Sequence, residues 1–321
     1  MKTFLLWGSG VCLLLTLVAF FPTPLIQYEI AWIEGDFWHQ PSGQVKWQKL
    51  ENKTKHVAIN PADKIKIGKG AQIIVTGKDG SGYLLNKAGV WRLQQLIDQP
   101  QIKSPSMVKQ YLGFLMQHIN HAEKSIDEYA EGYMRKKGLV NRGPGLTAPL
   151  MVSPQFESNL ENETVTFLWK SKPRTTSYTF AIYDDWNANA DPIFVKEIPD
   201  TSLQVSMDKT LLESDRLYYW SVAPQNTTQS IRYAFKRLKN DDLKKFEEKL
   251  TALQTDLKFN KAMNAFLKAG LYEENYFYPE ANRQFLNALE LEPKNQLFRQ
   301  SYALFLARHG QLDDAKKYLN M

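Results

Sequence analysis

Residues 262–321, AMNAFLKAGLYEENYFYPEANRQFLNALELEPKNQLFRQSYALFLARHGQLDDAKKYLNM, decide the fold of this chain. Apolar residues recur there after 34 positions: Ala269, Tyr278, Ala281 and Phe285 are followed by Ala303, Leu312, Ala315 and Leu319. Neighbouring members of each set at spacings of 3 or 4 share one side of a helix. A period of this length indicates helical hairpins that bury one another's apolar faces. The sequence therefore predicts a C-terminus built from α-helical hairpins.

This period resembles the tetratricopeptide repeat, which has small residues where its two helices cross, larger ones beside them and a proline at its end. The signature residues that carry the resemblance are Ala269, Tyr272, Tyr278, Ala281, Phe285, Ala288, Pro293, Ala303, Leu306, Gly310, Leu312, Ala315 and Leu319. The resemblance implies a structural and partner-binding role for them. The first turn, residues 274–277, lacks the glycine that Gly310 supplies in the second. Two repeats are fewer than a stable array needs, so we expect a further helix or a partner to pack against them.

That further helix is expected just upstream. We predict that the chain is helical from residue 231 onward, with a charged helix over 231–261 ahead of the repeat-like part at 262–321. Within it, a seam of apolar residues with spacings of 3 and 4 stands among lysines and glutamates: Leu243, Phe246, Leu250, Leu253 and Leu257. This spacing is typical of a helix that packs along one side.

Residues 146–230 have the alternation of β-strands. Polar and apolar residues alternate over 164–169, 177–183 and 203–206, with further strands expected at 193–198 and 217–222. Strands at this spacing, with polar turns between them, predict a β-sandwich. The phrases FLWK, SYTFAI and YYWSV resemble fibronectin type III or immunoglobulin-like domains. Such folds carry many functions, so this resemblance implies a fold and no particular role.

Residues 28–103 are predicted to form a smaller β-domain. Short strands are expected at 65–67, 72–75, 83–85 and 90–93, separated by glycine-rich turns. The phrases WQKL at 47–50, ADKIKIGKGA at 62–71 and Asp79-Gly80 before a strand resemble the extracytoplasmic FecR-type β-domain. Ala62 and Ile67 depart from the glycine and threonine usual in that family. FecR transducers also carry a cytoplasmic region that has no room here, so the resemblance implies the domain and not signal transduction.

A helix and linker, residues 104–145, join the two β regions. An apolar stripe with spacings of 3 and 4 runs from Val108 to Tyr133 and predicts one amphipathic helix over 107–137. The sequence Ser104-Pro105-Ser106 supplies its start, and Gly138 ends it.

The N-terminus, residues 1–27, predicts export. Phe4 to Phe21 is a run of 18 uncharged residues, the lower limit for spanning about 30 Å of hydrocarbon. Lys2 precedes it and acidic residues follow, so we expect the rest of the chain on the extracytoplasmic side. Small residues suited to signal peptidase are scarce before Pro22, which favours an uncleaved inner-membrane anchor over a cleaved signal peptide; both stay open.

Composition narrows the function. A 321-residue chain with 43% hydrophobic and 23% charged residues is ordinary for a globular protein of two or three domains. One cysteine excludes an internal disulfide framework. The net charge of +6 is diffuse, and an exported chain would meet no nucleic acid. The acidic and amide residues Asp185, Asn187, Asn189 and Asp191 alternate as in a calcium loop but lack its glycine and final glutamate, which favours a polar turn.

No arrangement of nucleophile, base and orienting group stands at a recognisable spacing, so we expect no enzyme and no cofactor. The interpretation is a multidomain protein, with an all-β FecR-like domain and a β-sandwich followed by tetratricopeptide-like α-helical hairpins. We expect a non-catalytic, membrane-anchored periplasmic scaffold that binds another envelope protein through its helical end. The alternative is a module whose β-domains bind cell-wall glycan or another carbohydrate.

Overall fold

The computed structural model describes residues 28–50, 57–77, 82–98, 110–111, 113–115, 125–136, 149–162, 164–170, 175–187, 189–206, 212–225, 227, 231–256 and 259–320. Strands occupy most of its N-terminal two thirds and helices its C-terminal part. The predicted order, β regions first and helices last, is confirmed at this level. None of the helices within these ranges has the length and apolarity to cross a membrane, and residues 4–21 lie outside them.

The first β unit, residues 28–98, has two four-stranded antiparallel sheets, ordered β4-β1-β6-β7 and β3-β2-β5-β8. Its elements are β1 (Tyr28–Glu34), β2 (Phe37–Gln40), β3 (Gln48–Leu50), β4 (Ala58–Ile59), β5 (Lys64–Ile67), β6 (Gln72–Gly77), β7 (Gly82–Leu85), β8 (Gly89–Arg92) and helix α1 (Leu93–Ile97). Gly35 turns the chain from one sheet into the other at φ +82°, and a Cβ there would lie 2.9 Å from that of Ala71. Only glycine fits this crossing.

The second β unit, residues 149–237, has sheets ordered β10-β16-β15-β12-β13 and β14-β11-β9. Its strands are β9 (Leu150–Ser153), β10 (Ser158–Leu160), β11 (Thr164–Lys170), β12 (Tyr178–Tyr183), β13 (Phe194–Ile198), β14 (Ser202–Ser206), β15 (Leu217–Pro224) and β16 (Tyr233–Arg237). Alternate residues of these strands enclose an aromatic core in which Phe167 lies 4.8 Å from Phe180 and 5.1 Å from Trp220, between ring centroids. Edge-to-face contacts of this kind add to the burial of the rings.

Two predictions about secondary structure are wrong in detail. Residues 233–237, expected to be helical, form β16, because Ala234 and Phe235 pack inward while the strand pairs with β15 and β10. The single helix expected over 107–137 is interrupted at Ser125, where a new helix, α3 (Ile126–Lys136), begins. Ser125 and Glu128 each accept a hydrogen bond from the other's backbone N–H, a capping box that starts a helix.

The helical unit, residues 240–320, comprises α4 (Asn240–Asp256), α5 (Lys261–Glu274), α6 (Tyr278–Leu291), α7 (Gln296–Arg308) and α8 (Leu312–Asn320). Helices α5 and α6 pack as one hairpin and α7 and α8 as another. Helix α4 covers α5 through Phe246 and Leu253, which are both buried. The seam predicted upstream of the repeat thus packs on it, and Leu257 lies outside the described residues.

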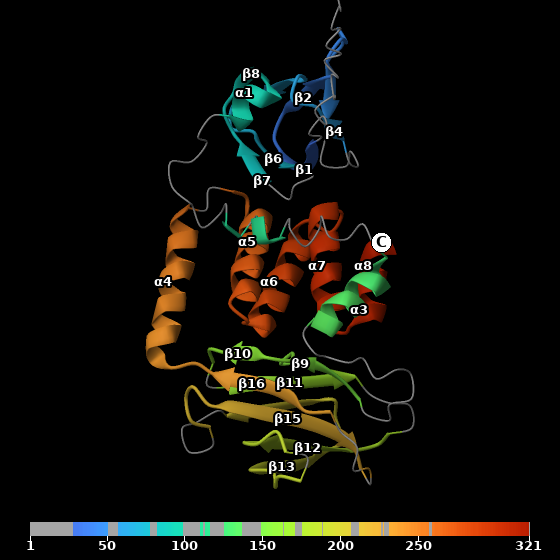
Figure 1. Ribbon diagram of the computed structural model, residues 1–321, viewed down its shortest axis with the longest axis vertical. Coiled ribbons are helices and arrows are strands. Elements are labelled where there is room, and N and C mark those ends of the chain that lie inside the picture. Colours follow the sequence, from blue (N-terminus) through green and yellow to red (C-terminus); the bar gives the residue numbers. More distant parts are fainter. Residues whose placement is uncertain are drawn as a thin grey trace, which may run out of the picture.

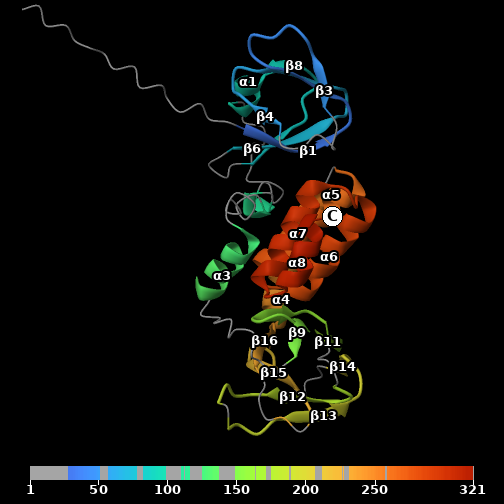
Figure 2. The ribbon, with the colours of Figure 1, turned by 90° about the vertical axis from the view of Figure 1, so that its right-hand side faces the viewer.

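The helical unit lies between the two β units, although it follows both in the sequence (Figure 1). The chain passes from the first β unit along the helices to the second β unit and then returns through α4 (Figure 1). Helix α3 lies alongside α7 and α8, as the turned view shows (Figure 2). Every other part of the described chain therefore meets the helical unit.

Candidate interaction site

The signature residues mostly pack between the helices. Those with less than a tenth of their surface exposed are Ala269, Tyr272, Tyr278, Ala281, Phe285, Ala288, Ala303, Leu306 and Ala315. Pro293 and Leu319 are exposed, while Gly310 and Leu312 are half-buried. The small residues give the helices their close contact, and a partner could reach few members of the set.

The two hairpins share their local geometry at positions 34 or 35 residues apart. Asn260 and Asn295 cap α5 and α7, each accepting a hydrogen bond from the backbone N–H three residues on. In the turns, Tyr276 has φ +67° where Gly310 has +76°. The turn that lacks a glycine therefore keeps the same left-handed backbone, and a tyrosine bears the strain.

The linker segment, by which we mean the described residues 110–111, 113–115 and 125–136, contacts α5 and α7 of the helical unit. Tyr111 and Leu115 are both buried there, and a Cβ added to Gly270 of α5 would lie 3.0 Å from Leu115 Cδ1. Gln110 donates hydrogen bonds to the Glu274 carboxylate, the shorter at 3.1 Å. Because Gly270 has no side chain, the linker segment can approach α5 closely.

A buried charged network joins α3 to both hairpins. The Arg308 guanidinium donates to Glu273 Oε1 from two nitrogens, and its Nη1 donates to Tyr129 Oη at 2.8 Å. Arg308 and Glu273 are 2% and 5% exposed. Burial lowers the pKa of Arg308 and the Glu273 carboxylate raises it; the carboxylate prevails, so the arginine stays charged. The sequence analysis missed these residues, whose only signal is a charge inside an apolar helix.

We expect Gly270→Val to loosen the linker segment, because the new side chain overlaps Leu115. Overpacking of this kind costs about 1–3 kcal/mol. Hydrogen exchange should accelerate at residues 110–115 and 126–136. Gly132→Ala in α3 is the matched control: nothing lies within 4 Å of its Cβ position, so it should slow exchange there through better helix propensity. Equal exchange in both variants would contradict the packing.

The first β unit meets the helical unit through the outer side of its β1–β6 sheet. Trp32 and Ile74, paired across β1 and β6, are 2% and 0% exposed and belong to the apolar core of the helices rather than that of their own unit. The Trp32 ring lies edge-on to Phe259, just before α5, with 6.1 Å between centroids. The two units therefore share a core.

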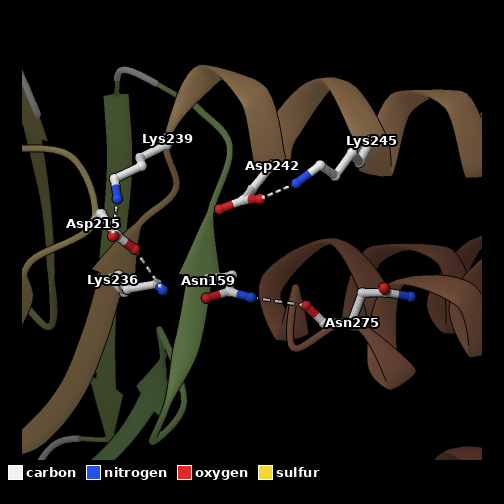
Figure 3. Close-up of polar contacts among 7 residues, drawn as sticks. All are labelled: Asn159, Asp215, Lys236, Lys239, Asp242, Lys245 and Asn275. Atoms are coloured by element: carbon white, nitrogen blue, oxygen red, sulfur yellow. Dashed lines mark hydrogen bonds and ion pairs between the residues drawn. The ribbon is translucent and has the colours of Figure 1, made fainter.

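The second β unit is joined to the helical unit by polar contacts. Asn159 of β10 donates from its backbone N–H to Tyr276 O at 2.8 Å and from its side chain to Asn275 O at 2.9 Å, the latter drawn in Figure 3. Lys170 of β11 forms an ion pair with Asp314 of α8. Both ends of the helical array are thus tied to strands.

The connection from β16 into α4 is fixed by charge. Asp215 lies 3.0 Å from Lys236 Nζ and 2.5 Å from Lys239 Nζ, on either side of the point where the strand ends (Figure 3). Asp242 and Lys245 form a further pair in the first turns of α4 (Figure 3). These pairs are at least partly exposed to solvent, so they orient the connection and add little stability.

Glu280, in the first turn of α6, faces the second β unit. Asn162 Nδ2 donates to its Oε1 at 3.2 Å, while its Oε2 is buried and has no partner among the described residues. Burial, with the nearby Glu161 carboxylate, raises the pKa of Glu280 to about 7 against the opposing effect of Arg283. The carboxyl group is therefore held partly neutral at this joint.

Glu280 should make stability fall as pH rises. Its folded pKa of about 7 exceeds the ordinary 4.5, so between these values the folded protein holds the extra proton and the free energy of unfolding decreases with pH. At pH 8 we expect Glu280→Gln to have a free energy of unfolding about 3 kcal/mol above that of the parent, and at pH 4.5 a value near the parent's. Glu248→Gln on exposed α4 should change neither value. A pH-independent effect of Glu280→Gln would contradict the assignment.

The loop after β12, in which Asp185, Asn187, Asn189 and Asp191 alternate with other residues, is bound by an arginine from another part of the chain. The Arg232 guanidinium donates to the carbonyl oxygens of Asp185, at 3.0 Å, and Asn187. Asp185 Oδ1 accepts from the Asn187 N–H at 2.9 Å, closing a turn. No group of three or more histidine, cysteine, aspartate or glutamate residues suited to a metal occurs in the part of the chain that the structure describes.

His39 and Asp63 form a buried pair that the sequence did not indicate. His39 Nε2 lies 2.9 Å from Asp63 Oδ2, and Asp63 Oδ1 accepts from the Ser42 backbone N–H at 2.8 Å. Ser42 contributes its amide and not its hydroxyl to this contact, so the three residues brace the turn before β5.

No protein-family model matches the chain, and no curated protein matches its sequence. The assignment of a function therefore depends on the contacts described above.

Proposed function

We propose that the protein is a non-catalytic scaffold of the cell envelope, anchored by its N-terminal segment with the rest of the chain in the periplasm. In this proposal its tetratricopeptide-like helical unit binds another envelope protein. The observation that carries the proposal is that the helical unit contacts both β units and the linker segment, so a partner bound there is placed relative to all of them.

The chemistry of the helical unit suits the recognition of helices. On its α5/α7 side it already receives an amphipathic segment of the same chain, with Tyr111, Leu115 and Tyr129 as the contacting side chains. Aromatic and aliphatic anchors on one side of a helix are a common means of peptide recognition. That side is occupied, so a partner must use other helices.

The exposed apolar residues of α6 and α8 mark the surface that we assign to the partner. Leu291 is 47% exposed at the end of α6, and Leu319 is 40% exposed at the end of α8. Each of these leucines is in the second helix of its hairpin. Lys316 and Lys317 beside Leu319 are paired within the chain, with Asp127 and Asp314, so the apolar side chains are the part of this surface that we assign to the contact.

Photo-crosslinking in intact envelopes tests this proposal. A photoreactive residue at Leu319 should give an adduct with one specific envelope protein, lost when Leu291 is changed to Asp. The matched control is Val195, an exposed apolar residue of the second β unit, which is 52% exposed. The proposal fails if Leu319 gives no adduct, or if both positions capture the same proteins.

A further inference from the structure

The outer face of the five-stranded sheet and the loop beside it carry aromatic residues that lie outside the core of the second β unit. Tyr183 of β12 and Tyr219 of β15 lie opposite each other in the sheet. Their neighbours Ile182 and Trp220 point into the core, so the two tyrosines lie on the outer face. Trp186 follows on the loop after β12, 59% exposed, with its ring 5.4 Å from that of Tyr219. We call Tyr183, Trp186 and Tyr219 the aromatic platform.

Arg232 holds the backbone of the loop that carries Trp186. The Arg232 guanidinium stacks on Tyr183, with 3.5 Å from Cζ to the ring centroid. From there it donates to the Asp185 and Asn187 carbonyl oxygens, one on each side of Trp186. An arginine thus fixes the backbone while the tryptophan stays exposed. A loop held in this way loses little entropy when a ligand binds.

The border of the platform is polar. Asp185 and Asn187 are exposed, and Asp184 pairs with Arg216 at 2.8 Å. Both arginines are engaged with oxygen atoms of the protein. Asp185 and Asn187 are exposed, and each also accepts a backbone hydrogen bond through its Oδ1. The border therefore offers hydrogen-bond acceptors and donors, and its two arginines, Arg216 and Arg232, are held by contacts within the protein.

We propose that the aromatic platform binds a neutral oligosaccharide. A pyranose ring has an apolar C–H face that matches the faces of Trp186 and Tyr219, and a ring of hydroxyl groups that matches the polar border. The acidic side chains at the border disfavour anionic glycans. A single highly exposed ring among polar side chains is also smaller than the apolar patch that a protein partner would need. This site is separate from the protein-binding surface proposed on α6 and α8.

Ligand-observed NMR on the full-length chain, in a detergent without sugar headgroups, tests the proposal. The probes are the tetrasaccharides chitotetraose and cellotetraose, which are neutral, and a heparin-derived tetrasaccharide, which is anionic. We expect saturable binding of at least one neutral probe and none of the anionic one. Trp186→Ala should raise the Kd for the neutral probe that binds by roughly tenfold or more, and Trp186→Phe should raise it by less.

Trp47→Ala is the matched control, because Trp47 is an exposed tryptophan of the first β unit, 39% exposed. It should leave the Kd unchanged, and all variants should melt at the temperature of the parent. The proposal is overturned if the parent binds neither neutral probe, if it binds only the anionic one, or if Trp186→Ala binds as tightly as the parent.

Discussion

Arg308→Met lowers the free energy of unfolding by about 3–5 kcal/mol, the usual cost of removing one partner of a buried ion pair. The substitution keeps much of the volume of the side chain but leaves the Glu273 carboxylate buried without its two hydrogen bonds. It also removes the donor to Tyr129, so α3 should detach from α7 before the hairpins unfold. Denaturant unfolding followed by circular dichroism measures the loss.

The double variant Arg308→Met/Glu273→Met is the informative control, since removing both charges should recover most of the lost stability. Arg299→Met, on the same helix, should cost much less because Arg299 is half-buried and its Nε donates to a backbone oxygen of α8 at 3.1 Å. If Arg308→Met unfolds at the same denaturant concentration as the parent, the buried network does not hold these helices together.

Trp32→Ala separates the first β unit from the helical unit, at a cost of about 3–5 kcal/mol for a buried tryptophan. Because Trp32 belongs to the core of the helices, the sheets of its own unit should survive. We expect hydrogen exchange to accelerate at the start of α5 and in α4, while β2, β5 and β8 keep their protection.

Trp47→Ala provides the comparison, because Trp47 is exposed and its loss should change stability by less than about 0.5 kcal/mol. Phe37→Ala, which opens the core of the first β unit itself, should instead expose its sheets. If Trp32→Ala affects only the first β unit, as Phe37→Ala does, the two units do not share a core.

The sequence predicts local structure well wherever its period is strong. The spacing of 34 residues placed the two hairpins, since Ala281 and Ala315 recur where close helix contact is needed. Alternation likewise placed β11, β12 and β15, whose inward residues form an aromatic core. In each case the pattern records which side of an element is buried, and burial is what the sequence encodes most directly.

The arrangement of the units was beyond reach of the same reasoning. The helical unit lies between two β units that precede it, because Trp32, Tyr111 and Tyr129 complete its surface from distant parts of the chain. The periodicity of the helices does not predict which distant residues pack against them. Strand β16 was missed because its five residues border a long charged helix, and its pairing with β10 and β15 is non-local.

The buried charges show the same limit. Glu273 and Arg308 are 35 positions apart in the sequence. Their residue types predict exposure to solvent, yet each side chain is nearly fully buried. Their chemistry depends on the contact between α5 and α7, which only the folded chain provides. Trp186 is the opposite case: its residue type favours a place in the core, yet it is exposed on the loop after β12.

Zero-length carbodiimide crosslinking tests most directly that the helical unit holds the rest of the chain around it. Asp127 of α3 lies 2.7 Å from Lys316 of α8, and Lys170 of β11 pairs with Asp314, so each pair can form an isopeptide bond without a spacer. With mixed unlabelled and ¹⁵N-labelled full-length chains, mass spectrometry should find both bonds within single chains. Absence of both bonds, or their occurrence only between labelled and unlabelled chains, would contradict the account.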